Sequence, residues 1–212
     1  MDIAIALFPG FTALDAVGPY EVLARLPGYT VTFVGDELGP VRSDTGRLCV
    51  QVEARLDDLP NPAVILVPGG PGQADQMDNQ RLLDWIRHAH ETTAWTTSVC
   101  TGSLLLGAAG VLDGKRATSY WLALEQLQSF GAQPTSQRVV IEGKVITAAG
   151  VSAGIDMALT LAGLIAGDVV AQRLQLAIEY DPQPPFSAGS PATAPDEVVR
   201  YLRDRSRFVL QG

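Results

Sequence analysis

Residues 95–110 read WTTSVCTGSLLLGAAG and contain a strand, a sharp turn and a helix in that order. The β-branched run before Cys100 predicts a buried strand, and the small and apolar residues after it predict a helix that Gly110 caps. Cys100 therefore stands at the turn, with its side chain projecting from the edge of a sheet. Enzymes with α/β folds place nucleophiles on such turns, and the amides of a helix N-terminus favour a thiolate. We interpret Cys100 as a nucleophilic thiol.

Strands and helices alternate on both sides of this turn. The sequence predicts buried strands over residues 2–8, 29–35 and 63–70, and hairpins over 41–53 and 138–150. It predicts a helix over 12–26 that either breaks at Pro19 or truly begins near it. It also predicts helices over 79–92, over 120–130, and over 152–179, the last interrupted at Gly163 and Gly167. A surface loop rich in Pro, Gly and Ser follows over 181–195. This alternation predicts an α/β fold with a mostly parallel sheet covered on both faces, as one domain over residues 1–212.

Composition limits the classes of protein to which the chain can belong. The 212 residues carry a formal net charge of −8 and are 47% hydrophobic, which is typical of a globular protein and predicts no nucleic-acid partner. No run of about 20 apolar residues could span a membrane. Two cysteines exclude a disulfide framework. We expect a soluble, cytoplasmic protein, and we interpret the arginines near the C-terminus, which alternate with acidic residues, as a solvated helix face.

Two further features follow the carboxyl ends of predicted strands, where open α/β sheets bind ligands. Asp15 lies in the apolar sequence ALDAVGP and is either a helix cap or an acid. Beside a thiolate, burial and like charge would keep Asp15 protonated, and Glu21 competes for the same role. The turn Pro68–Gly72 includes Gly69 and Gly70, whose amides either face a ligand or simply end a strand.

The remaining reactive side chains indicate what the site lacks. We interpret Cys49 as a core-packing residue, because it lies at no such turn. His88 and His90 lie two residues apart on one predicted helix and so point to different faces. They form neither a metal-binding pair nor an evident base for Cys100. The sequence therefore predicts no metal site, and the helix N-terminus together with a carboxylic acid must activate the thiol, with hydroxyl help from Thr101.

Several segments resemble the PfpI/ThiJ superfamily, which includes the parkinsonism-associated deglycase. They are LFPGFTALDAVGPYEVL (7–23), ILVPGGPG (65–72) and TSVCTGSLLLGAAGVLDGKRATSYW (97–121). Two later segments are similar to the isocyanide hydratase branch, namely AGVSAGIDMALTLA (149–162) and LQLAIEYDPQPPFSAGSP (174–191). The resemblance implies a flavodoxin-like three-layer sandwich, a homodimer, and no metal or organic cofactor. The family's site residues correspond here to Cys100, Thr101, Asp15, Gly69 and Gly70.

One position departs from the superfamily pattern. Many relatives have a histidine where this chain has Tyr120, and tyrosine is a poor base because its reference pKa is about 10. We expect Tyr120, with Gly69 and Gly70, to bind the substrate. The departure disfavours chemistry by a Cys-His pair but leaves isocyanide hydration possible, since that reaction needs a nucleophile and an acid.

The resemblance implies that Cys100 attacks the terminal carbon of a small isocyanide while Asp15 supplies a proton. Water then converts the thioimidate to an N-substituted formamide. Two alternatives stay open. One is a cofactor-independent glyoxalase or deglycase acting on methylglyoxal. The other is a non-enzymatic redox sensor in which Cys100 is oxidised.

Overall fold

A seven-stranded sheet forms the centre of the protein. The structure is a computed structural model, and it describes residues 1–208. The strands lie in the order β10-β11-β7-β6-β1-β2-β5. Every neighbouring pair is parallel except β10 and β11, which form an antiparallel hairpin. In sequence order they are β1 (Asp2–Ala6), β2 (Thr30–Gly35), β5 (Ala54–Arg55), β6 (Val64–Val67), β7 (Trp95–Val99), β10 (Val139–Glu142) and β11 (Val145–Ala148).

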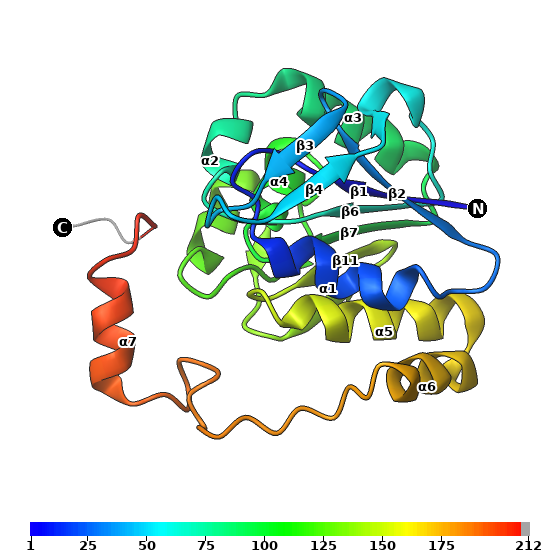
Figure 1. The fold of residues 1–212 in the computed structure, drawn as a ribbon. Coiled ribbons are helices and arrows are strands. Elements are labelled where there is room, and N and C mark those ends of the chain that lie inside the picture. The colour runs from blue at the N-terminus through cyan, green and yellow to red at the C-terminus, as the bar shows by residue number, and fades with distance from the viewer. Residues whose placement is uncertain (209–212) are drawn as a thin grey trace.

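Helices cover the sheet on both faces and complete a three-layer α/β sandwich (Figure 1). One layer contains α2 (Gln73–Gln76), α3 (Gln80–Thr92) and α4 (Gly102–Ala108). The opposite layer contains α1 (Ala13–Leu23), α5 (Ala153–Ala166) and α6 (Asp168–Ala177), with α5 packed between α1 and α6. The predicted fold class is therefore confirmed.

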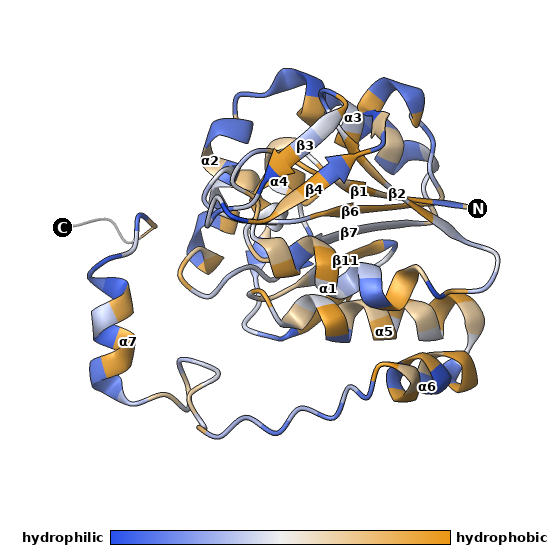
Figure 2. Ribbon diagram, viewed as in Figure 1, coloured by the Kyte–Doolittle hydropathy of each residue, from blue (hydrophilic) through white to orange (hydrophobic). Residues whose placement is uncertain are grey.

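The core lies between these layers. The four residues of β6 are all buried, and so are the last four of β1, because strands of a parallel sheet are covered on both faces. In Figure 2 the central strands are mainly hydrophobic, whereas the outer side of α3 is hydrophilic. Apolar residues at helical spacing, among them Leu82, Leu83 and Ile86, place the other side of α3 on the sheet.

Three predicted element boundaries are wrong. Helix α1 runs through Pro19 without a break, and α5 packs closely there, since a Cβ on Gly154 would lie 3.0 Å from Cγ of Pro19. The predicted helix over 120–130 contains instead the 3-10 helix η2 (Leu124–Phe130). The long helical region is interrupted at Gly167, whose φ of 87° ends α5, and not at Gly163.

Smaller elements surround the sandwich. The predicted hairpin over 41–53 is present as β3 (Gly39–Arg42) and β4 (Cys49–Val52). The 3-10 helix η1 (Leu56–Asp58) follows β5, and a short parallel pair joins β8 (Arg116–Ala117) to β9 (Gln133–Pro134). An exposed, extended arm after α6 leads to α7 (Asp196–Arg203), which lies apart from the layers (Figure 1). Within residues 1–208, no helix combines the length and apolar character needed to cross a membrane.

Candidate active site

Cys100 occupies a strained turn between β7 and α4. Its φ is 56°, in the left-handed region that non-glycine residues seldom adopt. Hydrogen bonds hold the turn, because the hydroxyls of Ser103 and Ser119 each donate to the Cys100 carbonyl at 3.1 Å. The Cys100 amide donates to the carbonyls of Ala148 and Ala149 at the end of β11. The role of Ser119 could not be found from the sequence, since it lies 19 residues beyond the turn.

Asp15 lies beside this thiol and is completely buried. Its Oδ2 accepts a hydrogen bond of 2.9 Å from the amide of Gly69. Its Oδ1 is also buried and makes no hydrogen bond to another of the described residues. Burial is the main cause that raises the pKa of Asp15 from 3.8 to about 7, and the Gly69 amide and the neighbouring Cys100 thiol oppose it. A carboxyl group in this position holds a proton over much of the neutral range and can donate it.

The pKa of the Cys100 thiol is raised from 9.0 to about 12, chiefly by burial and then by the charge of Asp15. The sequence indicated only the amides of the turn, which favour a thiolate, and not this effect of burial on the thiol pKa. Backbone amides of Val151 and Thr101 oppose the increase, but burial dominates. Because a charged Asp15 raises the thiol pKa, keeping Asp15 protonated favours the thiolate, and the two groups titrate as a pair.

Val151 is a site residue that the sequence interpretation missed. It has a positive φ of 35° and lies two residues before the first residue of α5, where its amide faces the thiol. The available signal was the sequence ITAAGVSAG (146–154), which, like the turn at Cys100, leads from a strand into a helix. The thiol thus lies near the beginnings of two helices, α4 and α5.

The turn that contains Gly69 and Gly70 packs closely against neighbouring backbone, and its two amides donate hydrogen bonds to protein groups. The amide of Gly69 donates to Asp15, and the amide of Gly70 donates to Oγ1 of Thr101 at 3.0 Å. A Cβ on Gly69 would lie 2.4 Å from the Thr101 nitrogen, and one on Gly70 would lie 2.4 Å from the Thr12 nitrogen. These glycines permit close approach of three loops. The predicted ligand-facing amides are already engaged, although Gly70 does line the cavity beside Cys100.

That cavity has a volume of about 290 Å³ and includes Cys100, Thr101, Gly70 and Tyr120 in its walls. Tyr120 packs on Gly150, where a Cβ would lie 2.8 Å from its ring. None of the described residues that line this cavity is a histidine. The structure therefore brings Cys100, Asp15, Thr101, Gly70 and Tyr120 together, with the carboxyl group of Asp15 just behind the cavity wall.

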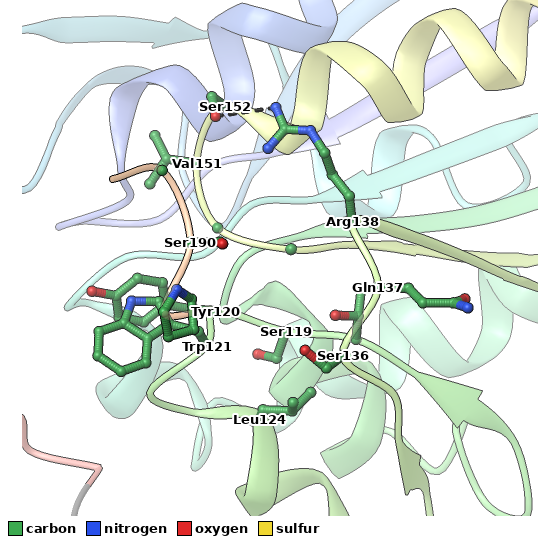
Figure 3. Close-up of a pocket in the computed structure, with 15 residues that line it drawn as sticks. Ser119, Tyr120, Trp121, Leu124, Ser136, Gln137, Arg138, Val151, Ser152 and Ser190 are labelled. Atoms are coloured by element: carbon green, nitrogen blue, oxygen red, sulfur yellow. Dashed lines mark hydrogen bonds between the residues drawn. The ribbon is translucent and has the colours of Figure 1, made fainter. Parts of the chain in front are cut away.

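A second, larger cavity of about 390 Å³ adjoins the first and shares Tyr120 and Val151 with it. Figure 3 shows Tyr120 and Trp121 on one side of it, with the hydroxyl of Ser190 from the exposed arm nearby. Cys100 does not line this larger cavity, so we assign the chemistry to the smaller one.

Other residues singled out in the sequence lie away from the site or play different parts. Cys49 is exposed at the start of β4, so its interpretation as a core residue is wrong. Glu21 is exposed and pairs with Arg25 at 2.7 Å. His88 is exposed near Glu91, and His90 Nδ1 is 2.8 Å from Oγ1 of Thr96. Within the described part of the chain, no cluster of three or more His, Cys, Asp and Glu side chains could hold a metal ion.

Comparison with known proteins points to one family. The sequence profile of the DJ-1/PfpI family matches residues 1–163. The chain is 47% identical over 206 residues to the isonitrile hydratase of Pseudomonas putida, covering 97% of this chain and 90% of that protein. It is 30% identical over 204 residues to the HTH-type transcriptional regulator CdhR of Pseudomonas aeruginosa, covering 84% of this chain and 60% of that protein.

A solved structure gives the same result. The crystal structure of a ThiJ/PfpI family protein from Pseudomonas syringae superposes with a TM-score of 0.93 at 38% sequence identity. The match covers 96% of this chain and 84% of that chain. Most of this chain therefore has a counterpart in that structure.

Proposed function

The chain belongs to the DJ-1/PfpI family, and we propose that within it this protein is an isocyanide hydratase, a lyase-type enzyme that converts an isocyanide and water to an N-substituted formamide. The observation that carries the proposal is the buried pair of Asp15 and Cys100 beside a small cavity. The 47% identity to an isonitrile hydratase over nearly the whole chain supports the same reaction.

Cys100 acts as the nucleophile in this reaction. The proton that the pair shares resides on Asp15 in the reactive form, so sulfur is a thiolate. Sulfur forms a bond to the terminal carbon of R–N≡C, and the Asp15 proton moves to that carbon. The products of this step are a thioimidate, R–N=CH–S–Cys, and an Asp15 carboxylate. The strained turn keeps the sulfur in place, because the hydroxyls of Ser103 and Ser119 both donate hydrogen bonds to the backbone carbonyl of Cys100.

Asp15 then assists hydration of the thioimidate. A water oxygen bonds to the thioimidate carbon, and Asp15 takes one water proton and transfers it to nitrogen. The C–S bond breaks as the hydroxyl proton passes back to Asp15. The step releases R–NH–CHO and restores the thiolate and the protonated acid, so no external oxidant or reductant is consumed. Thr101 supports the geometry through its hydroxyl contact with Gly70.

The lining of the cavity favours this reaction over the methylglyoxal alternative. Aldehyde isomerisation needs a further proton carrier, and histidine is the residue best suited to it near neutral pH, yet none is found among the described lining residues.

A substrate panel tests the proposal. Purified protein is incubated with cyclohexyl isocyanide, methylglyoxal and a peptide amide, and products are followed by mass spectrometry. We expect formamide from the isocyanide, with no comparable turnover of the other two. Turnover of methylglyoxal in preference to the isocyanide would overturn the proposal.

We also propose that the chain acts in the cytoplasm as a homodimer. Leu164, Val169 and Leu176, on the neighbouring helices α5 and α6, expose apolar side chains, and a second copy could cover them. Analytical ultracentrifugation tests the assembly. A monomer at micromolar concentration would contradict it.

A further inference from the structure

Residues 204–208, which follow α7, lead back to the cavity that contains Cys100. The arm before α7, residues 181–195, is almost entirely exposed, and α7 has no buried residue. Figure 1 shows α7 beyond the carboxyl ends of the parallel strands, with the chain after it turning back toward the sandwich. There, Arg207 and Phe208 both line the small cavity. Arg207 is one of the arginines predicted to form a solvated helix face, but it lies beyond the end of α7 and lines this cavity.

Arg207 anchors the returning segment to the glycine turn. Its Nη1 donates to the Pro71 carbonyl at 2.6 Å, and its Nη2 lies 3.3 Å from both the Gly70 carbonyl and Oε1 of Gln73. A guanidinium group suits this arrangement because it presents several donors in a fixed plane. The turn that packs against Asp15 and Cys100 is thereby joined to a segment more than 130 residues later in the chain.

Phe208 places an apolar ring on the cavity wall. The ring is partly buried and packs on the hydrophobic core, and the Arg207 guanidinium lies 4.6 Å from its centre. Its backbone carbonyl accepts a hydrogen bond of 3.3 Å from Nε2 of Gln126, in η2. Phe208 is thus held from two sides, by the glycine turn through Arg207 and by η2.

The cavity needs this wall if it is to distinguish substrates. In the proposed reaction the isocyanide carbon bonds to Cys100, so the R group must lie against the cavity walls. The apolar side chains in the cavity wall include Tyr120, Pro71, Val151 and Phe208. The volume of the cavity, about 290 Å³, lies just below the usual range for ligand pockets. Part of the apolar contact that an R group can make therefore depends on Phe208.

We propose that residues 204–208 form a specificity wall, in which Phe208 contacts the R group and favours isocyanides whose apolar R group is large enough to reach it, while Arg207 positions Phe208. This inference rests on the proposed function. It assigns Phe208 to substrate recognition and makes Arg207 a positioning residue. The anchors are a few partly exposed hydrogen bonds, each of modest net strength, so the wall can open to admit substrate without unfolding the sandwich.

The test compares Phe208→Ala, Arg207→Gln and the control Arg205→Gln. Arg205 is exposed, and within residues 1–208 its guanidinium donates to the Tyr201 carbonyl and lies over the Tyr201 ring, at the end of its own helix. Steady-state kinetics are measured with methyl and cyclohexyl isocyanide. All proteins carry Cys49→Ser, and alkylation of Cys100 is timed with iodoacetamide and with the bulkier N-phenylmaleimide.

Phe208→Ala should raise KM for cyclohexyl isocyanide by about tenfold or more, as lost apolar contacts in a pocket do, with kcat and the methyl substrate little affected. Arg207→Gln should act in the same direction and accelerate N-phenylmaleimide labelling relative to iodoacetamide. If both variants match Arg205→Gln in size preference and labelling, the wall does not exist.

Two further outcomes separate this inference from others. If the parent protein converts neither isocyanide, the proposed function fails, while the labelling ratio still decides whether the segment covers Cys100. If mixing Cys100→Ala protein with Phe208→Ala protein restores the size preference, the segment serves the cavity of a second copy. That result would overturn its assignment to the cavity of its own chain.

Discussion

Replacing Asp15 by asparagine should make the protein more stable at alkaline pH and almost inactive. Asp15 is completely buried, and its pKa is raised from 3.8 to about 7, mainly by burial. Between these pH values the folded protein binds a proton that the unfolded chain has lost, so the free energy of unfolding falls as pH rises through the window. The full loss, about 4 kcal/mol for this pKa difference, applies above pH 7.

Asparagine cannot ionise and therefore avoids this loss. Its side-chain oxygen can still accept the hydrogen bond that Oδ2 of Asp15 receives from Gly69, so wild type and variant should have similar stability below about pH 4. At pH 8 the variant should be more stable by up to about 4 kcal/mol. Urea denaturation at pH 4, 6 and 8 measures the difference, with Asp181→Asn, an exposed carboxylate in the arm, as the control.

The same variant should lose the acid of the reaction. A positioned general acid contributes about a hundredfold to ten-thousandfold, so isocyanide turnover should fall by roughly that factor. Iodoacetamide should still label Cys100, since removing the Asp15 charge removes one cause of its raised pKa. Identical pH dependence of stability in wild type and variant would refute the buried, protonated carboxyl group. Retained turnover would show that another group supplies the proton.

Three further outcomes follow from the site. Cys100→Ala should abolish formamide production in a continuous isocyanide assay. Cys49→Ser, at an exposed position, should retain most of it. Turnover by the Cys100 variant would exclude covalent catalysis. The value of kcat/KM should rise as pH increases through about 7, because the pair of Asp15 and Cys100 loses its first proton there and the thiolate can form. A pH–rate profile that falls over this range would contradict this prediction. Gly70→Ala should destabilise the protein by about 3 kcal/mol or more, because φ at this position is 132° and the new Cβ would lie 2.4 Å from the Thr12 nitrogen. An unfolding midpoint close to that of wild type would show that the loops containing Gly70 and Thr12 can separate.

Local sequence patterns determined most of the fold. The buried strands and α3 are read correctly because apolar periodicity reflects which faces are covered, and this information lies within each segment. The same holds for Cys100, whose place between β7 and α4 follows from a strand run leading into a helix pattern. The boundaries that failed, at Pro19 and over 120–130, are those at which packing with α5 or a 3-10 helix competes with local preference.

The sequence alone also indicated that Cys100 and Asp15 belong to one site, because both follow the carboxyl ends of strands of a parallel sheet. It did not determine their protonation. That depends on complete burial and on the Gly69 amide, contacts that join residues 54 positions apart. The exposure of the Cys49 side chain likewise could not be predicted, because the alternation of apolar and polar residues does not show which way the first residue of an outer strand faces.

Only the tertiary structure decided what surrounds the thiol. The residues around the thiol come from three separate segments, namely Ser119, Val151, and Arg207 with Phe208, and nothing in their local sequence relates them to Cys100. They meet because the sheet brings β11 beside β7 and because the chain after α7 turns back over the glycine turn. Periodicity records how each segment faces the core, whereas contacts between distant segments depend on how the whole chain closes, which no single segment encodes.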